Sequence, residues 1–171
     1  FANKAVGLAG KDPDVLTLCA RVWIDLRHQE KKWYKDAEKL LKKALKRKKN
    51  HEGATYYTGE LYLYQYEFSQ AEDQFRKVVE MKGEYSAKAD KMWQMSQKIV
   101  RAMPGTPAGK KIALYEEITR ADLAVLLAEE LKISTLIERQ TTPASGFQTP
   151  EEMRNANSPA GGPSDSKGHW A

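Results

Sequence analysis

The chain has 171 residues, of which 41% are hydrophobic and 30% are charged. This composition is typical of a folded globular protein and excludes an intrinsically disordered chain. No run of about 18 apolar residues is present, so we expect no transmembrane helix. The single cysteine, Cys19, excludes an intrachain disulfide and argues against a thiolate metal site.

The net charge of +5 is concentrated in residues 31–49, which hold ten Lys or Arg residues against two acids. Such a run could bind nucleic acid or another polyanion. The residues that would do so are Lys42, Lys43, Lys46, Arg47 and Lys49. We favour the solvated face of an amphipathic helix, because an apolar stripe runs through the segment at helical spacing. Single-strand binding needs aromatic residues interleaved with the basic ones, and none lies within residues 42–49, so nucleic acid is not the expected partner.

The N-terminal part is predicted to be helical throughout. Residues 1–10 are expected to form the end of an upstream repeat helix that stops at Gly10. Asp12 and Pro13 are suited to the N-cap and first turn of a new helix, which we expect to run to about Gln29. Cys19 lies on the apolar face of this helix, where a buried, inert thiol is expected. A second helix is predicted from Tyr34 to Lys49.

Residues 52–83 form the clearest helical hairpin in the sequence. The predicted helices cover residues 53–66 and 69–81, with Ser69 as the N-cap of the second and Gly83 as its end. Ala71 recurs as Ala37, 34 residues earlier, and Phe75 aligns with Leu41. A period of this size is typical of helical-hairpin arrays. A further helix over residues 86–103, stopped by Pro104, is expected to cap the last hairpin.

Residues 13–103 resemble the tetratricopeptide repeat family. Gly59 matches the small residue where the two helices of a repeat touch, and Tyr62, Ala71 and Phe75 match the packing positions around it. A small residue lets two backbones approach, and an aromatic ring then fills the space beside it. The resemblance implies an all-α solenoid over residues 11–104, made of two helical-hairpin repeats and a capping helix.

The resemblance also implies a protein partner bound on the concave face formed by the first helices of the repeats. The positions expected to face this partner are Val22, Leu26, Gln29, Tyr56, Glu60, Leu63 and Tyr64. The surplus of tyrosines at positions 56, 57, 62, 64 and 66 suits peptide recognition, since Tyr combines a large contact area with a polar tip. The alternative is that half of them pack between repeats.

A different pattern covers residues 105–134. Thr106 and Pro107 are predicted to start a short helix, and Thr119 with Asp122 is predicted to form a capping box for the next one. Residues 118–127 resemble the end of an S-layer homology motif, and residues 164–171 resemble the opening of another. This resemblance implies attachment to cell-wall polysaccharide, with Thr119 and Arg120 as candidate contacts. The alternative for Arg120 is an exposed first-turn residue. Residues 135–171 are predicted to be a flexible linker and tail.

The sequence offers no catalytic constellation. Its three histidines have no metal-ligand spacing with Cys19 or with one another, and no nucleophile has an evident base. We therefore expect a non-catalytic protein without cofactor or metal. The function that we expect is a protein–protein interaction scaffold or adaptor of a bacterial cell-envelope complex, with the cytoplasm as the alternative location. Polyanion binding and polysaccharide attachment are the alternative functions.

Overall fold

The computed structural model describes residues 10–133, 135 and 137, and this part of the chain is helical and contains no strand. The all-α class predicted from the sequence is therefore confirmed. The elements are α2 (Pro13–Asp25), a 3-10 turn η1 (Leu26–His28), α3 (Trp33–Arg47), α4 (Glu52–Tyr64), α5 (Phe68–Met81), α6 (Ser86–Ala102), α7 (Pro107–Ile112) and α8 (Arg120–Glu129). The helix expected over residues 1–10 and the tail expected over residues 135–171 lie almost wholly outside the described residues.

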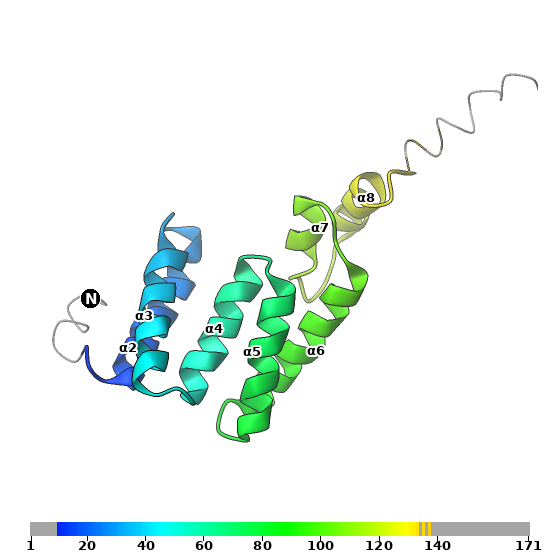
Figure 1. Cartoon of the computed structure of the whole chain (residues 1–171). Helices are drawn as coiled ribbons and strands as arrows, with labels where there is room; N and C mark the ends of the chain where they lie inside the picture. The colour runs from blue at the N-terminus through cyan, green and yellow to red at the C-terminus, as the bar shows by residue number, and fades with distance from the viewer. Residues whose placement is uncertain (1–9, 134, 136, 138–171) are drawn as a thin grey trace, which may run out of the picture.

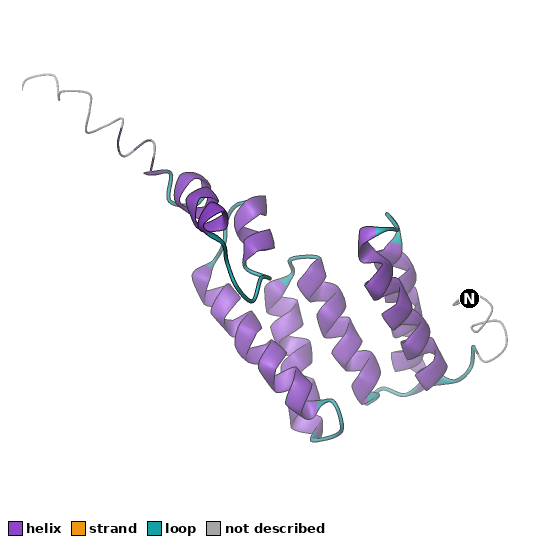
Figure 2. Cartoon of the chain, turned by 180° about the vertical axis from the view of Figure 1, so that it is seen from behind, coloured by secondary structure: helices purple, strands orange, loops and turns teal. Residues whose placement is uncertain are grey.

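The helices form a row of antiparallel neighbours (Figure 1). Helix α2 pairs with α3, and α4 pairs with α5. Helix α4 also packs against both α2 and α3, which joins the two hairpins into one core. Helix α6 lies along α5 and closes the row, while α7 and α8 contact each other beyond the end of α6 (Figure 2). None of the described helices is long and apolar enough to cross a lipid bilayer.

Side-chain caps fix where α2 and α4 begin. The Asp12 carboxylate accepts a hydrogen bond from the Asp14 amide at 2.9 Å, with Pro13 in the first turn, as predicted. His51 caps α4, since its Nδ1 accepts from the Ala54 amide at 3.1 Å. An accepting Nδ1 leaves the proton on Nε2, which donates to the Asp14 carboxylate at 2.9 Å. The His51 imidazole thus caps the start of α4 and connects this helix to α2 by a hydrogen bond.

Helix α4 is buried on most of its circumference because three helices pack around it. Its buried residues are Gly53, Ala54, Thr55, Tyr56, Tyr57, Gly59, Leu61 and Leu63. Phe75 of α5 is fully buried and its ring lies against Gly59. The small residue that the sequence places at this contact is therefore required by the packing.

Helix α2 ends at Asp25, before the predicted Gln29, and the two ends of α5 also differ from the sequence prediction. Helix α5 begins at Phe68, and Glu67 occupies the N-cap position without a side-chain hydrogen bond, so Ser69 is not the cap. Phe68 is 8% exposed, and burying its ring draws it into the first turn. At the other end Lys82 is the C-cap in a left-handed conformation, with φ of 53°, so the helix ends one residue before the predicted Gly83.

Helices α7 and α8 form a small unit that is held together by polar contacts. Thr119 and Asp122 form the predicted capping box, and the Thr106 hydroxyl accepts from the Gly109 amide at 3.0 Å. Glu130 accepts hydrogen bonds from the Gly105 amide at 3.1 Å and from the Thr106 amide at 2.8 Å. These contacts connect the end of α8 with the start of α7.

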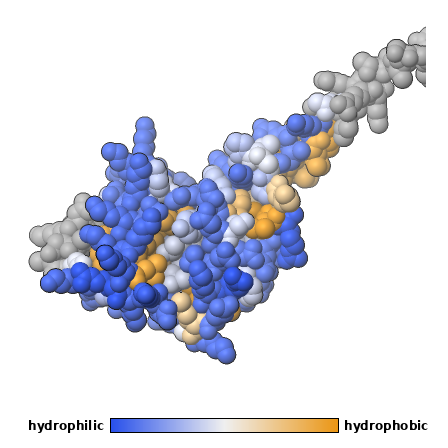
Figure 3. Space-filling model, in the orientation of Figure 1, coloured by the Kyte–Doolittle hydropathy of each residue, from blue (hydrophilic) through white to orange (hydrophobic). Residues whose placement is uncertain are grey.

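Helix α8 itself buries no residue. Its side chains Leu123 and Val125 are 47% and 37% exposed. The face of the molecule in Figure 3 is mainly hydrophilic, with an apolar patch where α8 lies. Helix α7 contacts α8, and Leu126 and Leu127 are half-buried, while Leu123 and Val125 are left exposed.

Candidate functional site

A polar cleft of about 190 Å³ lies on the face formed by α2, α4 and the start of α6. We call it the first-helix cleft. It is lined by Arg21, Ile24 and Asp25 of α2, by Tyr56, Tyr57, Glu60 and Tyr64 of α4, and by Tyr85 and Lys88 at the start of α6. Its rim therefore carries charges of both signs around a group of tyrosines.

Three of these tyrosines form the base of the first-helix cleft. The ring centroid of Tyr56 lies 5.3 Å from that of Tyr57 and 5.2 Å from that of Tyr85, and the last two lie 5.9 Å apart. Glu52 positions Tyr85, because its carboxylate accepts from the Tyr85 amide at 2.8 Å. Such tilted and edge-to-face ring pairs are each worth about 0.5–1.5 kcal/mol beyond their buried area. The base of the cleft is consequently rigid.

Burial keeps the phenols of this cleft in their neutral form. Desolvation raises the pKa of Tyr57 to about 12, with a smaller contribution from Tyr85. Desolvation likewise raises the pKa of Tyr56 and of Tyr64, and the nearby Glu60 carboxylate adds to both shifts. Neutral phenols can donate as well as accept hydrogen bonds. The cleft thus presents hydroxyl groups rather than additional charge.

Glu60 is the half-buried carboxyl group of the cleft. Its pKa is raised mainly by desolvation, and the Asp25 carboxylate adds to the shift. The Tyr56 hydroxyl and the guanidinium groups of Arg21 and Arg27 act in the opposite direction. Arg21 also lies 3.9 Å from Asp25, so the α2 side of the cleft is a small network of exposed charges.

The α2 residues that line the cleft are not the ones that the sequence assigned to a partner. Tyr56 and Glu60 line the cleft together with Arg21 and Asp25, which precede them by 35 residues rather than 34. The predicted contacts Val22, Leu26 and Gln29 do not line it. One residue turns a helix by about 100°, which moves a side chain to another face. The structure thus brings Tyr56 and Glu60 together with Arg21 and Asp25 rather than with Val22 and Leu26.

Three of the four α4 residues that the sequence assigned to a partner lie together in this cleft. Tyr56, Glu60 and Tyr64 all line the first-helix cleft. Leu63 does not, because it is 1% exposed and belongs to the core. The sequence prediction missed Tyr85 and Lys88 because it considered the two repeats only, and both residues belong to the start of the capping helix α6.

Packing accounts for much of the tyrosine surplus. Tyr56 and Tyr57 are 7% and 6% exposed, and Tyr62 and Tyr64 are half-buried against the core. Tyr66, in contrast, is 38% exposed. The alternative that tyrosines pack between the repeats therefore applies to several of them. Only the hydroxyl groups of these buried tyrosines are left to contact a ligand.

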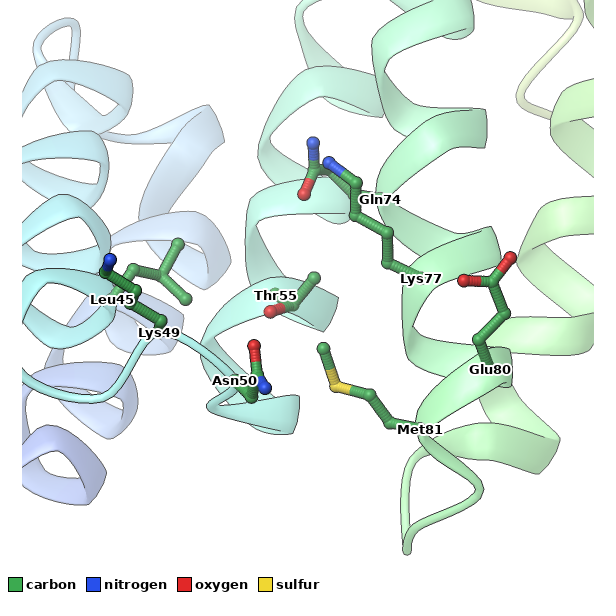
Figure 4. A pocket seen from close by; sticks show the side chains of 8 residues that line it. All are labelled: Leu45, Lys49, Asn50, Thr55, Gln74, Lys77, Glu80 and Met81. Atoms are coloured by element: carbon green, nitrogen blue, oxygen red, sulfur yellow. The ribbon is translucent and has the colours of Figure 1, made fainter.

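A second hollow of about 510 Å³ separates α3 from α5 (Figure 4). Leu45 and Lys49 line it on one side, and Gln74, Lys77, Glu80 and Met81 line it on the other, with Asn50 and Thr55 between them. Most of these are long, flexible side chains with no mutual hydrogen bond among the described residues. The hollow therefore lacks a preorganised set of polar groups.

The basic run forms the outer face of α3. Leu40, Leu41 and Ala44 are buried, and the lysines of the helix are exposed, as an amphipathic helix requires. Lys42 lies 2.7 Å from Glu38, one turn earlier, and this hydrogen bond raises the pKa of Lys42. Only Lys49 of the five predicted anion-binding residues lines any of the clefts described here.

The two candidate polysaccharide contacts lie at the start of α8. The Thr119 hydroxyl donates to the Asp122 carboxylate at 2.7 Å and accepts from the Asp122 amide at 3.1 Å. Arg120 is exposed in the first turn, as its alternative interpretation predicts. The Thr119 hydroxyl is therefore already engaged in capping the start of its own helix.

Comparison with known proteins adds no functional information. No protein-family model matches the chain, and no curated protein or solved structure matches it either. Within residues 10–133, no three His, Cys, Asp or Glu side chains are grouped so that they could hold a metal ion. Functional inference therefore rests on the chemistry of the clefts.

Proposed function

We propose that this chain is a non-catalytic protein–protein interaction scaffold that binds a segment of its partner in the first-helix cleft. The observation that carries the proposal is the meeting of three helices at one cleft with a tyrosine base and a rim of opposite charges. Tyrosines and arginines are the residues on which binding energy concentrates in protein interfaces. The tetratricopeptide-like repeat arrangement remains part of this proposal.

The size and polarity of the cleft favour a peptide over a small molecule. Small-molecule sites are typically apolar and enclose about 300–1,000 Å³. The first-helix cleft has a volume of only about 190 Å³ and is lined largely by polar and charged groups. A peptide can leave most of its surface outside such a cleft and insert one or two polar side chains.

The charges of the rim suit a segment that carries both signs. Lys88 and Arg21 offer ammonium and guanidinium groups, and Asp25 and Glu60 offer carboxyl groups. Complementary charges fix the register and orientation of a partner more than they raise its affinity. We therefore expect binding that is specific and sensitive to salt.

The location in a bacterial cell envelope is the second part of the proposal. It is supported by the likeness of residues 118–127 and 164–171 to S-layer homology motifs. It predicts that the protein fractionates with the envelope of its native cell. Recovery in the cytoplasmic fraction would contradict it and would leave the binding proposal standing.

Affinity capture of partners by the full chain tests the binding proposal. Lys88→Glu reverses a charge on the rim, and Tyr56→Phe removes one hydroxyl while keeping the buried ring. Lys42→Glu on the outer face of α3 is the control. We expect capture of a defined protein by the wild type and by the control, and a loss of roughly tenfold or more for Lys88→Glu. Equal capture by all of these chains would overturn the proposal.

A further inference from the structure

A separate cleft of about 410 Å³ lies where α2 and α4 end and where α7 contributes a third side. Figure 1 shows these helices within the array. We call it the end cleft. Its lining consists of Arg27 and His28 of η1, Trp33 at the start of α3, Tyr64 and Tyr66 at the end of α4, and Lys111, Leu114 and Tyr115 of α7 and the turn after it. It combines four aromatic rings with three basic side chains.

No carboxyl group lines the end cleft. The described ion pairs involve Arg21, Lys42, His51 and Arg76, and none of them includes a basic residue of this cleft. Glu60 interacts electrostatically with Arg27 but lines the first-helix cleft, and Asp122 interacts electrostatically with Lys111 but does not line the end cleft. The cationic groups of the end cleft are thus without a carboxylate within ion-pair distance among the described residues.

Arg27 is held in place although no acid pairs with it. Its guanidinium lies over the ring of Tyr64, 4.2 Å from the centroid, and one of its amino groups donates to the Ile24 carbonyl oxygen at 3.4 Å. A guanidinium has five N–H donors in a planar fork that fits a carboxylate with two parallel hydrogen bonds. The stacked Arg27 therefore keeps donors available in a fixed orientation.

We propose that the end cleft binds an acidic peptide segment of a partner protein. A carboxylate of the peptide pairs with Arg27, and Lys111 neutralises a second acidic side chain. A neighbouring apolar side chain of the peptide packs against Trp33 and Tyr115. The proposal is independent of the first-helix cleft, since the charged groups that it uses, Arg27 and Lys111, line the end cleft only.

The same surface suits nucleic acid less well. Nucleotide bases stack on open ring faces. Here the guanidinium of Arg27 covers one face of Tyr64, and Trp33 packs against the core with its ring edge to Tyr34 at a centroid distance of 6.1 Å. Tyr66 is likewise paired edge-on with Phe68 at 6.2 Å. These rings can therefore contact a peptide side chain but offer little open ring face on which a base could stack.

Selection from a random peptide display library on the immobilised full chain tests the proposal. We expect the enriched peptides to be rich in Asp and Glu next to an apolar residue, and to lose affinity as salt is added. Lys111→Glu and Arg27→Ala should each weaken their binding by roughly tenfold or more. Arg76→Ala, on the exposed face of α5, is the control and should leave it unchanged.

Lys111 is exposed, so Lys111→Glu keeps the test decisive even if Arg27→Ala destabilises the array. Enrichment without an excess of acidic residues, or acidic peptides that bind Lys111→Glu as tightly as wild type, would overturn the proposal. So would the absence of any enrichment. A random single-stranded RNA pool that binds more tightly than the best peptide, with the same dependence on Arg27 and Lys111, would assign the cleft to nucleic acid instead.

Discussion

Gly59 of α4 and Phe75 of α5 are in such close contact that a Cβ atom on Gly59 would lie 2.7 Å from Cε1 of the Phe75 ring. Real Cβ atoms do not approach another atom so closely, so the absence of a side chain at Gly59 sets the separation of the two helices. Phe75 is fully buried and also lies 5.7 Å from the ring of Tyr56, between centroids. The contact therefore connects the core with the base of the first-helix cleft.

Gly59→Ala is expected to destabilise the array. The added methyl group must displace the Phe75 ring, and such overpacking costs about 1–3 kcal/mol. The higher helix propensity of Ala offsets no more than about 1 kcal/mol of this cost. Urea unfolding followed by circular dichroism measures the difference in the free energy of unfolding.

Gly53→Ala is the matched control in the same helix. A Cβ atom on Gly53 would meet its nearest neighbours, in Thr17 and Tyr85, at 3.5 Å, which is an ordinary contact. This variant should be as stable as the wild type or more stable by up to about 1 kcal/mol. Equal effects of the two substitutions would show that close packing at Gly59 is not the determinant.

His51→Ala is expected to loosen the start of α4. It removes the cap of the Ala54 amide and the link to Asp14, and loss of an N-cap costs about 0.5–2 kcal/mol. His51→Asn restores a capping side chain that is too short to reach α2, so its free energy of unfolding should be intermediate. The ranking wild type, Asn, Ala in urea unfolding checks this prediction, and an Asn variant no better than Ala would contradict the capping role.

Glu60 should make stability fall as the pH rises. Burial raises its pKa above the usual 4.5, so the folded state binds the proton more tightly than the unfolded state does. This contribution is complete below pH 4.5 and is lost as the pH increases through the raised pKa. Glu60→Gln removes it, so the variant should gain stability relative to the wild type between pH 4.5 and neutrality. If the free energies of unfolding of the wild type and of Glu60→Gln, measured in urea, changed in parallel with pH, the burial of this carboxyl group would be refuted.

Glu130 should control the protection of the amides of Gly105 and Thr106. The Thr106 side chain and the two amides lower the pKa of Glu130, so these contacts are complete above its usual 4.5 and weaken as the pH falls through the lowered pKa. Glu130→Ala should speed hydrogen exchange at both amides. Gly109→Ala should do the same, because its methyl group would occupy the position of the Glu130 carboxylate. Exchange at the Asp122 amide in the Thr119 capping box, which neither variant touches, serves as the internal reference.

Much of the helical architecture could be predicted because it depends on local chemistry. Helix starts are recognisable in the sequence because the capping residues contact only the first turn of their own helix. Examples are Asp12, Pro13 and Thr119. The apolar spacing along α3 and α5 likewise specifies the buried faces without knowledge of the partners. Even the need for a small residue at Gly59 was implied by the resemblance to the tetratricopeptide repeat family.

The details of the cleft could not be predicted because they depend on how helices are rotated against one another. The rotation of α2 against α4 puts Arg21 and Asp25, not Val22 and Leu26, into the cleft with Tyr56. The His51 cap is also hidden from sequence, since His is rarely a capping residue and Asp14 is 37 positions away. The end cleft is lined by residues of η1, α4 and α7. These elements are far apart in the sequence, so no local sequence pattern predicts that they lie close together.

Site-specific photo-crosslinking tests the central claim, that a partner protein is bound in the first-helix cleft, most directly. A photoreactive amino acid replaces Asp25 or Lys88 at the rim of the cleft, and Lys42 on the outer face of α3 in the control chain. After irradiation of cells that naturally produce the protein, we predict one shared crosslinked protein from positions 25 and 88 and none from position 42. The absence of a crosslink at both cleft positions, or the same crosslinked protein from position 42, would contradict the claim.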